Sequence, residues 1–107
     1  MKLFEKEGIT IKMGENAKEN WKLTLTAKPI YTWIHLSAFP SSHVIIESEN
    51  PSKEVIQYAA TLCHQYSKFK NLKKVKYSIT NCSNIIRGDK TGEVFFKSNK
   101  KVQDLFI

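Results

Sequence analysis

The chain has 107 residues, of which 41% are hydrophobic and 25% are charged, and its formal net charge is +7. This length and composition fit one globular domain over residues 1–107 and exclude a disordered or collagen-like chain. No uninterrupted apolar run is longer than Val44–Ile46, whereas a membrane-spanning helix needs roughly 20 such residues. The first residues turn acidic before an apolar stretch can build up, so we expect no secretory signal, no membrane contact and a cytoplasmic protein.

The excess charge lies in the second half of the chain. Residues 1–54 hold seven lysines and seven glutamates, whereas residues 55–107 hold ten basic and three acidic residues. Such an asymmetry attracts polyanions, and nucleic acid is the interpretation we favour. Solubility alone remains the plain alternative. Anionic lipid is less favoured, because no basic amphipathic helix with a large apolar face accompanies the charge.

In chain order, alternating apolar residues first predict a strand over residues 8–13. Residues 16–28 are ambiguous, because apolar residues alternate there as they would in a strand. Asn16 and Glu19, however, have the spacing of a helix capping box, and Pro29 supplies a stop. We therefore favour a helix over residues 17–27, with Ala17, Trp21 and Leu25 on its buried face.

Residues 30–36 are β-branched and aromatic, which predicts a strand buried on both faces. A turn over residues 39–42 leads into a second strand at 43–47, which we expect to pair antiparallel with the first. Asn50 as cap and Pro51 as first residue then predict an amphipathic helix over residues 51–68. Its apolar face is Val55, Ala59, Leu62, Cys63 and Tyr66.

Further strands are predicted at residues 75–80, 93–97 and 102–107, with Lys74 and Lys76 sharing one strand face. The sum is an α+β fold: a mostly antiparallel sheet of about five or six strands with two helices.

Two histidines flank the turn at 39–42, and a catalytic reading would make His35 or His43 a base and Ser41 or Ser42 a nucleophile. No carboxylate stands nearby in sequence to orient the imidazole, and the structural alternative is a pair of histidines that shape a sheet and a turn. We therefore expect no enzymatic activity. Cys63 and Cys82 form no Cys-x-x-Cys motif, so we expect reduced thiols, no metal and no cofactor.

Basic residues and aromatic residues are interleaved downstream of the second helix. Lysine and arginine contact phosphates, and exposed rings stack on unpaired bases. Periodicity places Tyr66 and Tyr77 in the core and leaves Phe69 as the ring available to a ligand. The candidate phosphate contacts are Lys68, Lys70, Lys73, Lys74, Lys76, Arg87 and Lys90.

Several separated segments resemble one family, the NFACT-R domain. The matching segments are Gly14–Asn20, Trp33-Ile34-His35, Pro40–Ile46, Ala59-Ala60-x-Leu62, Tyr66-Ser67-Lys68, Val75-x-Tyr77 and Gly88–Val94. They occur in order over about residues 8–102. The chain departs from the family pattern at Thr32, at Ser37-Ala38 and at Ser41, which stand where the family has Asp, often Arg-Asp, and Gly.

The resemblance implies an RNA-binding module of ribosome quality-control factors, with transfer RNA or ribosomal RNA as ligand and no catalytic step. It also supports the helix at 17–27. The ribosome or a larger quality-control factor is an expected partner, and DNA binding and a protein-interaction adaptor are the alternatives. The family's large N-terminal domain and coiled coil are not part of the sequence, so we expect no peptide-tail elongation. The resemblance adds these candidate nucleic-acid contacts: Asn16, Lys18, Asn20, His35, Ser42 and His43.

Overall fold

The computed structural model describes residues 1–37, 41–91 and 93–107. In this part of the chain six strands form one sheet in the order β1–β2–β4–β3–β5–β8, and β6 and β7 form a separate hairpin. All pairs are antiparallel, which confirms the predicted α+β fold. The elements are β1 (Lys2–Lys6), β2 (Ile9–Met13), α1 (Ala17–Thr26), β3 (Thr32–Leu36), β4 (Val44–Ile46), α2 (Lys53–Gln65), β5 (Lys76–Asn81), β6 (Ile85–Arg87), β7 (Val94–Phe96) and β8 (Gln103–Phe106), with 3₁₀ turns η1 (Cys82–Asn84) and η2 (Asn99–Lys101).

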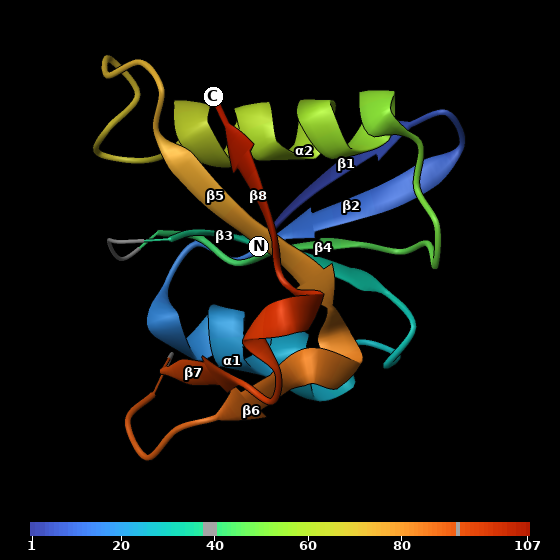
Figure 1. The fold of residues 1–107 in the computed structure, drawn as a ribbon, viewed down its shortest axis with the longest axis vertical. Coiled ribbons are helices and arrows are strands. Elements are labelled where there is room, and N and C mark those ends of the chain that lie inside the picture. Colours follow the sequence, from blue (N-terminus) through green and yellow to red (C-terminus); the bar gives the residue numbers. More distant parts are fainter. Residues whose placement is uncertain (38–40, 92) are drawn as a thin grey trace.

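The large sheet is covered on both faces. Figure 1 shows α2 along one face, and α1 together with the β6–β7 hairpin along the other. Alternate residues of the central strand β3 therefore enter different cores: Ile34 packs among α2 residues, whereas Trp33 packs with Leu23 of α1. This arrangement confirms the predicted strand buried on both faces. No helix in the described part of the chain is long and apolar enough to cross a membrane.

The first helix forms where the sequence predicts it, but it buries a different face. Asn16 caps it, since its Oδ1 accepts a hydrogen bond from the Glu19 N–H at 2.9 Å. The buried residues are Asn20 and Leu23, and Leu25 is 61% exposed. The predicted face of Ala17, Trp21 and Leu25 is therefore wrong. Ala17 is exposed, and Trp21 is only partly buried, with its Nε1 donating to the Glu93 carbonyl at 3.3 Å.

The second helix is shorter than predicted, because Ser52 rather than Asn50 is its cap and it ends at Gln65. Its buried residues include Val55, Ala59, Leu62 and Cys63, as predicted. The prediction for Tyr66 is wrong: this ring is 52% exposed, since the chain leaves the helix there and the helical period no longer applies. Tyr77 is fully buried, as predicted, and Phe69 packs against the core instead of remaining available.

Two further details differ from the sequence interpretation. Lys74 has a φ of 58° and precedes β5, which begins at Lys76, so the two lysines do not share a strand face. Strand β1 was not predicted at all, and it forms one edge of the sheet by pairing with β2. The predicted turn at 39–42 lies partly outside the described residues, but its two flanking strands do pair antiparallel.

Candidate functional site

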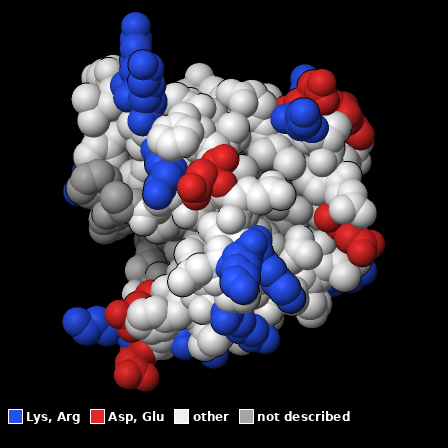
Figure 2. Space-filling view, in the orientation of Figure 1, with Lys and Arg blue, Asp and Glu red and all other residues white. Residues whose placement is uncertain are grey.

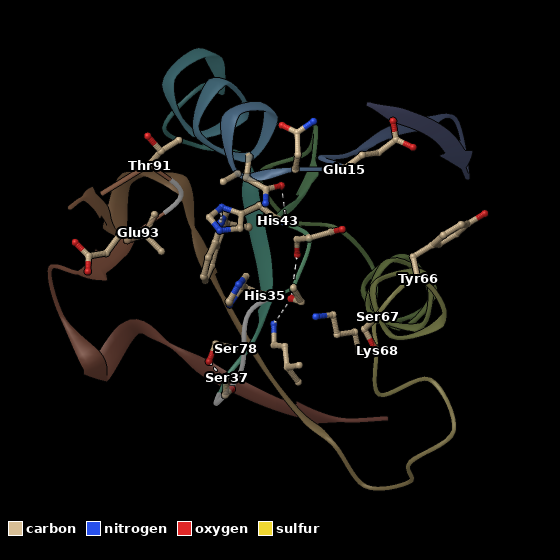
Figure 3. A pocket seen from close by; sticks show the side chains of 18 of the residues that line it. Glu15, His35, Ser37, His43, Tyr66, Ser67, Lys68, Ser78, Thr91 and Glu93 are labelled. Carbon is tan, nitrogen blue, oxygen red and sulfur yellow. Dashed lines mark hydrogen bonds between the residues drawn. The ribbon is translucent and has the colours of Figure 1, made fainter. Parts of the chain in front are cut away.

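A cleft of about 670 Å³ lies at the C-terminal end of β3, between the start of α1 and the residues that follow α2. Its walls come from several parts of the chain. They are residues 15–17 with Asn20 of α1, Trp33 with residues 35–37, residues 41–43, residues 66–68, Ser78, and Thr91, Glu93, Val94 and Phe96 of the hairpin segment. Figure 3 shows how these segments converge, and Figure 2 shows a hollow at one margin of the molecule, between the part that carries α2 and the part that carries α1. The cleft is of the size that binds small ligands or single groups of a larger one.

An array of rings forms the floor of the cleft. Trp33 and His35 stack with centroids 5.4 Å apart, and His43 meets His35 edge-on at 4.8 Å. The two histidines that flank the turn therefore lie side by side. The Trp33 Nε1 donates to Nδ1 of His43 at 3.3 Å, which leaves the proton of a neutral His43 on Nε2. Phe96 of the hairpin packs edge-on against Trp33 at 5.6 Å and completes the array.

Both imidazoles are uncharged at neutral pH. Burial lowers the pKa of His35, and burial together with the nearby His35 lowers the pKa of His43 to about 3. The floor therefore offers flat aromatic surfaces and neutral ring nitrogens, and it supplies no positive charge.

The amide of Asn20 holds this floor to α1. Its Oδ1 accepts a hydrogen bond from the backbone N–H of His43 at 3.0 Å, and the His43 carbonyl accepts one from the Gly14 N–H at 3.1 Å. A Cβ at Gly14 would lie only 2.0 Å from that Oδ1, so only glycine permits the approach. Asn16 is occupied as the helix cap. Gly14, Asn16 and Asn20 thus share a structural role, although Asn16 and Asn20 also line the cleft.

The Ser41 hydroxyl in the neighbouring turn is engaged with the backbone. The Ser41 hydroxyl accepts from the Leu36 N–H and donates to the Ser42 carbonyl, both at 3.2 Å. Cys63 lies beside it, with its Sγ 3.8 Å from the Ser41 Oγ, and burial raises the pKa of this thiol to about 11. Among the described residues, neither imidazole is hydrogen-bonded to a serine hydroxyl, so no nucleophile–base pair is assembled here.

Three charged residues line the cleft, and they point in different directions. Figure 3 shows the Lys68 side chain reaching into the cleft towards His35, whereas the carboxylates of Glu15 and Glu93 point away from its centre. Glu15 pairs with the N-terminal amine of Met1 at 2.8 Å and with Lys2 at 3.3 Å, and these contacts lower the pKa of its carboxyl. Glu93 accepts a hydrogen bond from the Asp89 N–H at 3.2 Å. Of these three charged side chains, it is therefore that of Lys68 that points into the cleft.

The predicted contacts divide into two groups. Six of them line the cleft, and the remaining seven lie outside it. Those that line it are Asn16, Asn20, His35, Ser42, His43 and Lys68, and those outside it are Lys18, Lys70, Lys73, Lys74, Lys76, Arg87 and Lys90. On the face seen in Figure 2, the basic side chains form separate groups with acidic ones between them.

Sequence reasoning missed the wall supplied by the hairpin. Trp33 and the residues Thr91, Glu93 and Val94 belong to two separate segments that resemble the family, and Phe96 belongs to none. No spacing in the sequence connects the hairpin residues to the histidines. Only the packing of the β6–β7 hairpin beside α1 brings them to the cleft.

This arrangement, a covered sheet with a ring-floored cleft and one inward-pointing cation, is that of a binding domain. Residues 1–98 match the model of the NFACT protein RNA binding domain, and the chain belongs to this family. The family resemblance and the RNA-binding role at family level are thereby confirmed.

Two relatives agree with this assignment. The chain is 34% identical over 98 residues to the Rqc2 homolog RqcH of Bacillus subtilis (strain 168), which corresponds to 89% of this chain and 17% of that protein. The structure of the C-terminal of the fibronectin/fibrinogen-binding protein from Streptococcus suis (FBPS) matches with a TM-score of 0.87 and 28% identity, over 98% of this chain and 43% of the other. The chain thus spans less than half the length of either relative.

Proposed function

We propose that the chain is a non-catalytic RNA-binding module that takes one unpaired nucleotide of a transfer or ribosomal RNA into the cleft. The observation that carries the proposal is the position of Lys68, whose side chain points into the cleft over a floor of uncharged rings. A nucleotide combines a flat base with an anionic phosphate, and the cleft offers a surface for each.

The base is held against the rings. Sequence-specific RNA contacts use unpaired bases that stack on aromatic side chains, histidine included, and that expose their edges to polar groups. His35 and Phe96 are the rings of the floor that are only partly buried, and the polar side chains of Asn20, Ser42 and Ser78 line the same cleft. The phosphate pairs with Lys68, which is exposed.

The cytoplasmic ribosome is the setting we propose for this contact. The relative RqcH is described as an Rqc2 homolog, and the model of the NFACT protein RNA binding domain matches residues 1–98 of this chain. An excess of positive charge in residues 55–107 favours a large RNA, because several phosphates can be contacted outside the cleft by the remaining basic residues, among them Lys70, Lys73 and Lys90.

Fluorescence anisotropy with the purified chain tests the proposal. The probes are labelled total transfer RNA, a ribosomal RNA stem-loop, the same stem as a closed duplex, and the DNA version of the stem-loop. We expect tighter binding to the RNAs with unpaired bases than to the duplex, and weaker binding for Lys68→Ala and His35→Ala. Lys53→Ala, which removes an exposed lysine at the start of α2, is the matched control and keeps full affinity.

Wild-type protein that binds none of these RNAs overturns the proposal. Equal affinity of Lys68→Ala and the control moves the site away from the cleft, and preference for the DNA probe supports the alternative of a DNA-binding module.

A second candidate is an adaptor that docks on a larger ribosome-associated factor. The observation in its favour is that the chain matches only 17% of RqcH and 43% of the Streptococcus suis chain, so in both relatives the domain is joined to further sequence. Co-sedimentation with ribosomal subunits that persists after nuclease treatment supports this candidate over direct RNA binding.

A further inference from the structure

The β6–β7 hairpin presents an apolar pair to solvent on its outer face. Ile86 and Phe95 stand directly opposite each other, and they are 45% and 56% exposed. Their neighbours Ile85 and Phe96 face the other way and pack in the core around Trp33. The two side chains form an apolar pair that is accessible to a ligand.

The segment that carries this pair is basic. Residues 85–101 contain five basic residues and two acidic ones. Lys97 directly follows β7 and is exposed, and its N–H donates to the Asn84 carbonyl at 2.9 Å, which extends the pairing of the hairpin by one hydrogen bond. Figure 2 shows basic side chains gathered over the region where η2 and the hairpin lie in Figure 1.

The basic residues near the exposed pair favour a nucleic acid over a protein as its ligand. The cores of protein–protein interfaces are depleted in lysine, whereas single-stranded nucleic acid is bound by rings on which bases stack, next to cations that contact phosphates. An exposed phenylalanine on a strand that continues into a lysine fits the second kind.

We propose that the outer face of the β6–β7 hairpin is a second RNA contact, in which an unpaired base stacks on Phe95 and its phosphate pairs with Lys97. This inference rests on the proposed RNA-binding function and extends it to a second nucleotide. Val94 and Phe96 line the cleft while Phe95 faces outward, so successive residues of β7 contact two parts of one bound RNA. The ligand is therefore a single-stranded segment or loop that passes around the hairpin.

Binding of a labelled RNA loop to four variants tests the contact. Phe95→Ala is expected to weaken binding by about 5- to 150-fold, the range typical of one lost base–aromatic stack. Phe95→Leu keeps an apolar side chain but no aromatic face and is expected to lose as much, whereas Phe95→Tyr retains affinity. Phe106→Ala is the matched control, because Phe106 is 59% exposed on β8 and outside both proposed contacts.

Phe95→Trp adds a direct readout: its emission is quenched when a base stacks on it, relative to wild type with its own two tryptophans. If Phe95→Leu keeps full RNA affinity while Phe95→Ala loses affinity, an apolar side chain is sufficient and stacking is not required. That result overturns the proposal in favour of an apolar surface for a protein. Full affinity of Phe95→Ala, with no quenching in Phe95→Trp, overturns it outright. In both cases wild-type binding and its loss in Lys68→Ala show that the proposed function itself stands.

Discussion

The side-chain amide of Asn20 and the backbone N–H of His43 are joined by a hydrogen bond of 3.0 Å in the interior of the protein. Asn20 belongs to α1 and His43 leads into β4, so this single contact ties the helix to the strand beneath the cleft. It also explains why a glycine precedes the helix: the asparagine amide occupies the space that a side chain at Gly14 would need.

Replacing Asn20 with alanine should destabilise the fold by about 1–3 kcal/mol, because the buried N–H of His43 loses its acceptor. Urea denaturation of the wild type and the variant measures the difference. Asn16→Ala, which removes the cap of the same helix, is the comparison: it should cost about 1 kcal/mol and leave the amide signal of His43 in place. An Asn20→Ala variant as stable as the wild type would contradict the prediction.

Replacing Gly14 with alanine should also destabilise the protein, because it displaces the side-chain amide of Asn20. The new Cβ lies 2.0 Å from the Asn20 Oδ1, so the side chain must move and its hydrogen bond to His43 is lost. In a double-mutant cycle, Gly14→Ala should therefore have a smaller effect on the free energy of unfolding when Asn20 is already alanine. Additive effects would mean that the glycine serves a different purpose.

Stability should fall as the pH is lowered from about 6.5 towards 3. In the unfolded chain a histidine takes up a proton near pH 6.5, whereas burial holds the pKa of folded His43 at about 3. Over this interval the unfolded state binds more protons, so the free energy of unfolding decreases with falling pH. His43→Gln should flatten this dependence, which a series of urea titrations would detect, and an equally steep profile in the variant would refute the assignment.

The steepness with which RNA affinity falls as salt is added should report how many lysines contact phosphate. Each such contact on single-stranded RNA contributes a slope of about −0.7 in a plot of log affinity against log salt. Lys68→Ala is expected to reduce the slope by one contact, and the combined change of Lys68, Lys70, Lys73 and Lys74 to alanine by more. Lys53→Ala should leave it unchanged. A slope that the combined variant does not alter would exclude this loop from the interface.

The sequence predicted most of the sheet because its strands alternate regularly and both cover layers are apolar. It failed at β1, where Leu3 is 61% exposed and no buried face reveals the strand. It also exchanged the roles of Tyr66 and Phe69, since the helical period was extended past Gln65, where the helix ends.

The candidate site was predictable only in its local part. A turn between paired strands brings His35 and His43 together, and a capping pattern places Asn16 and Asn20 on one helix. Phe96 reaches the same cleft through tertiary packing across the whole chain, and no spacing in the sequence encodes that distance.

The span of the cleft has a consequence for synthesis of the protein. Its walls come from residues as far apart as Asn16 and Phe96, so a growing chain lacks one wall until translation has passed the hairpin. The complete cleft, and with it the nucleotide contact proposed above, therefore forms only after the hairpin has been synthesised.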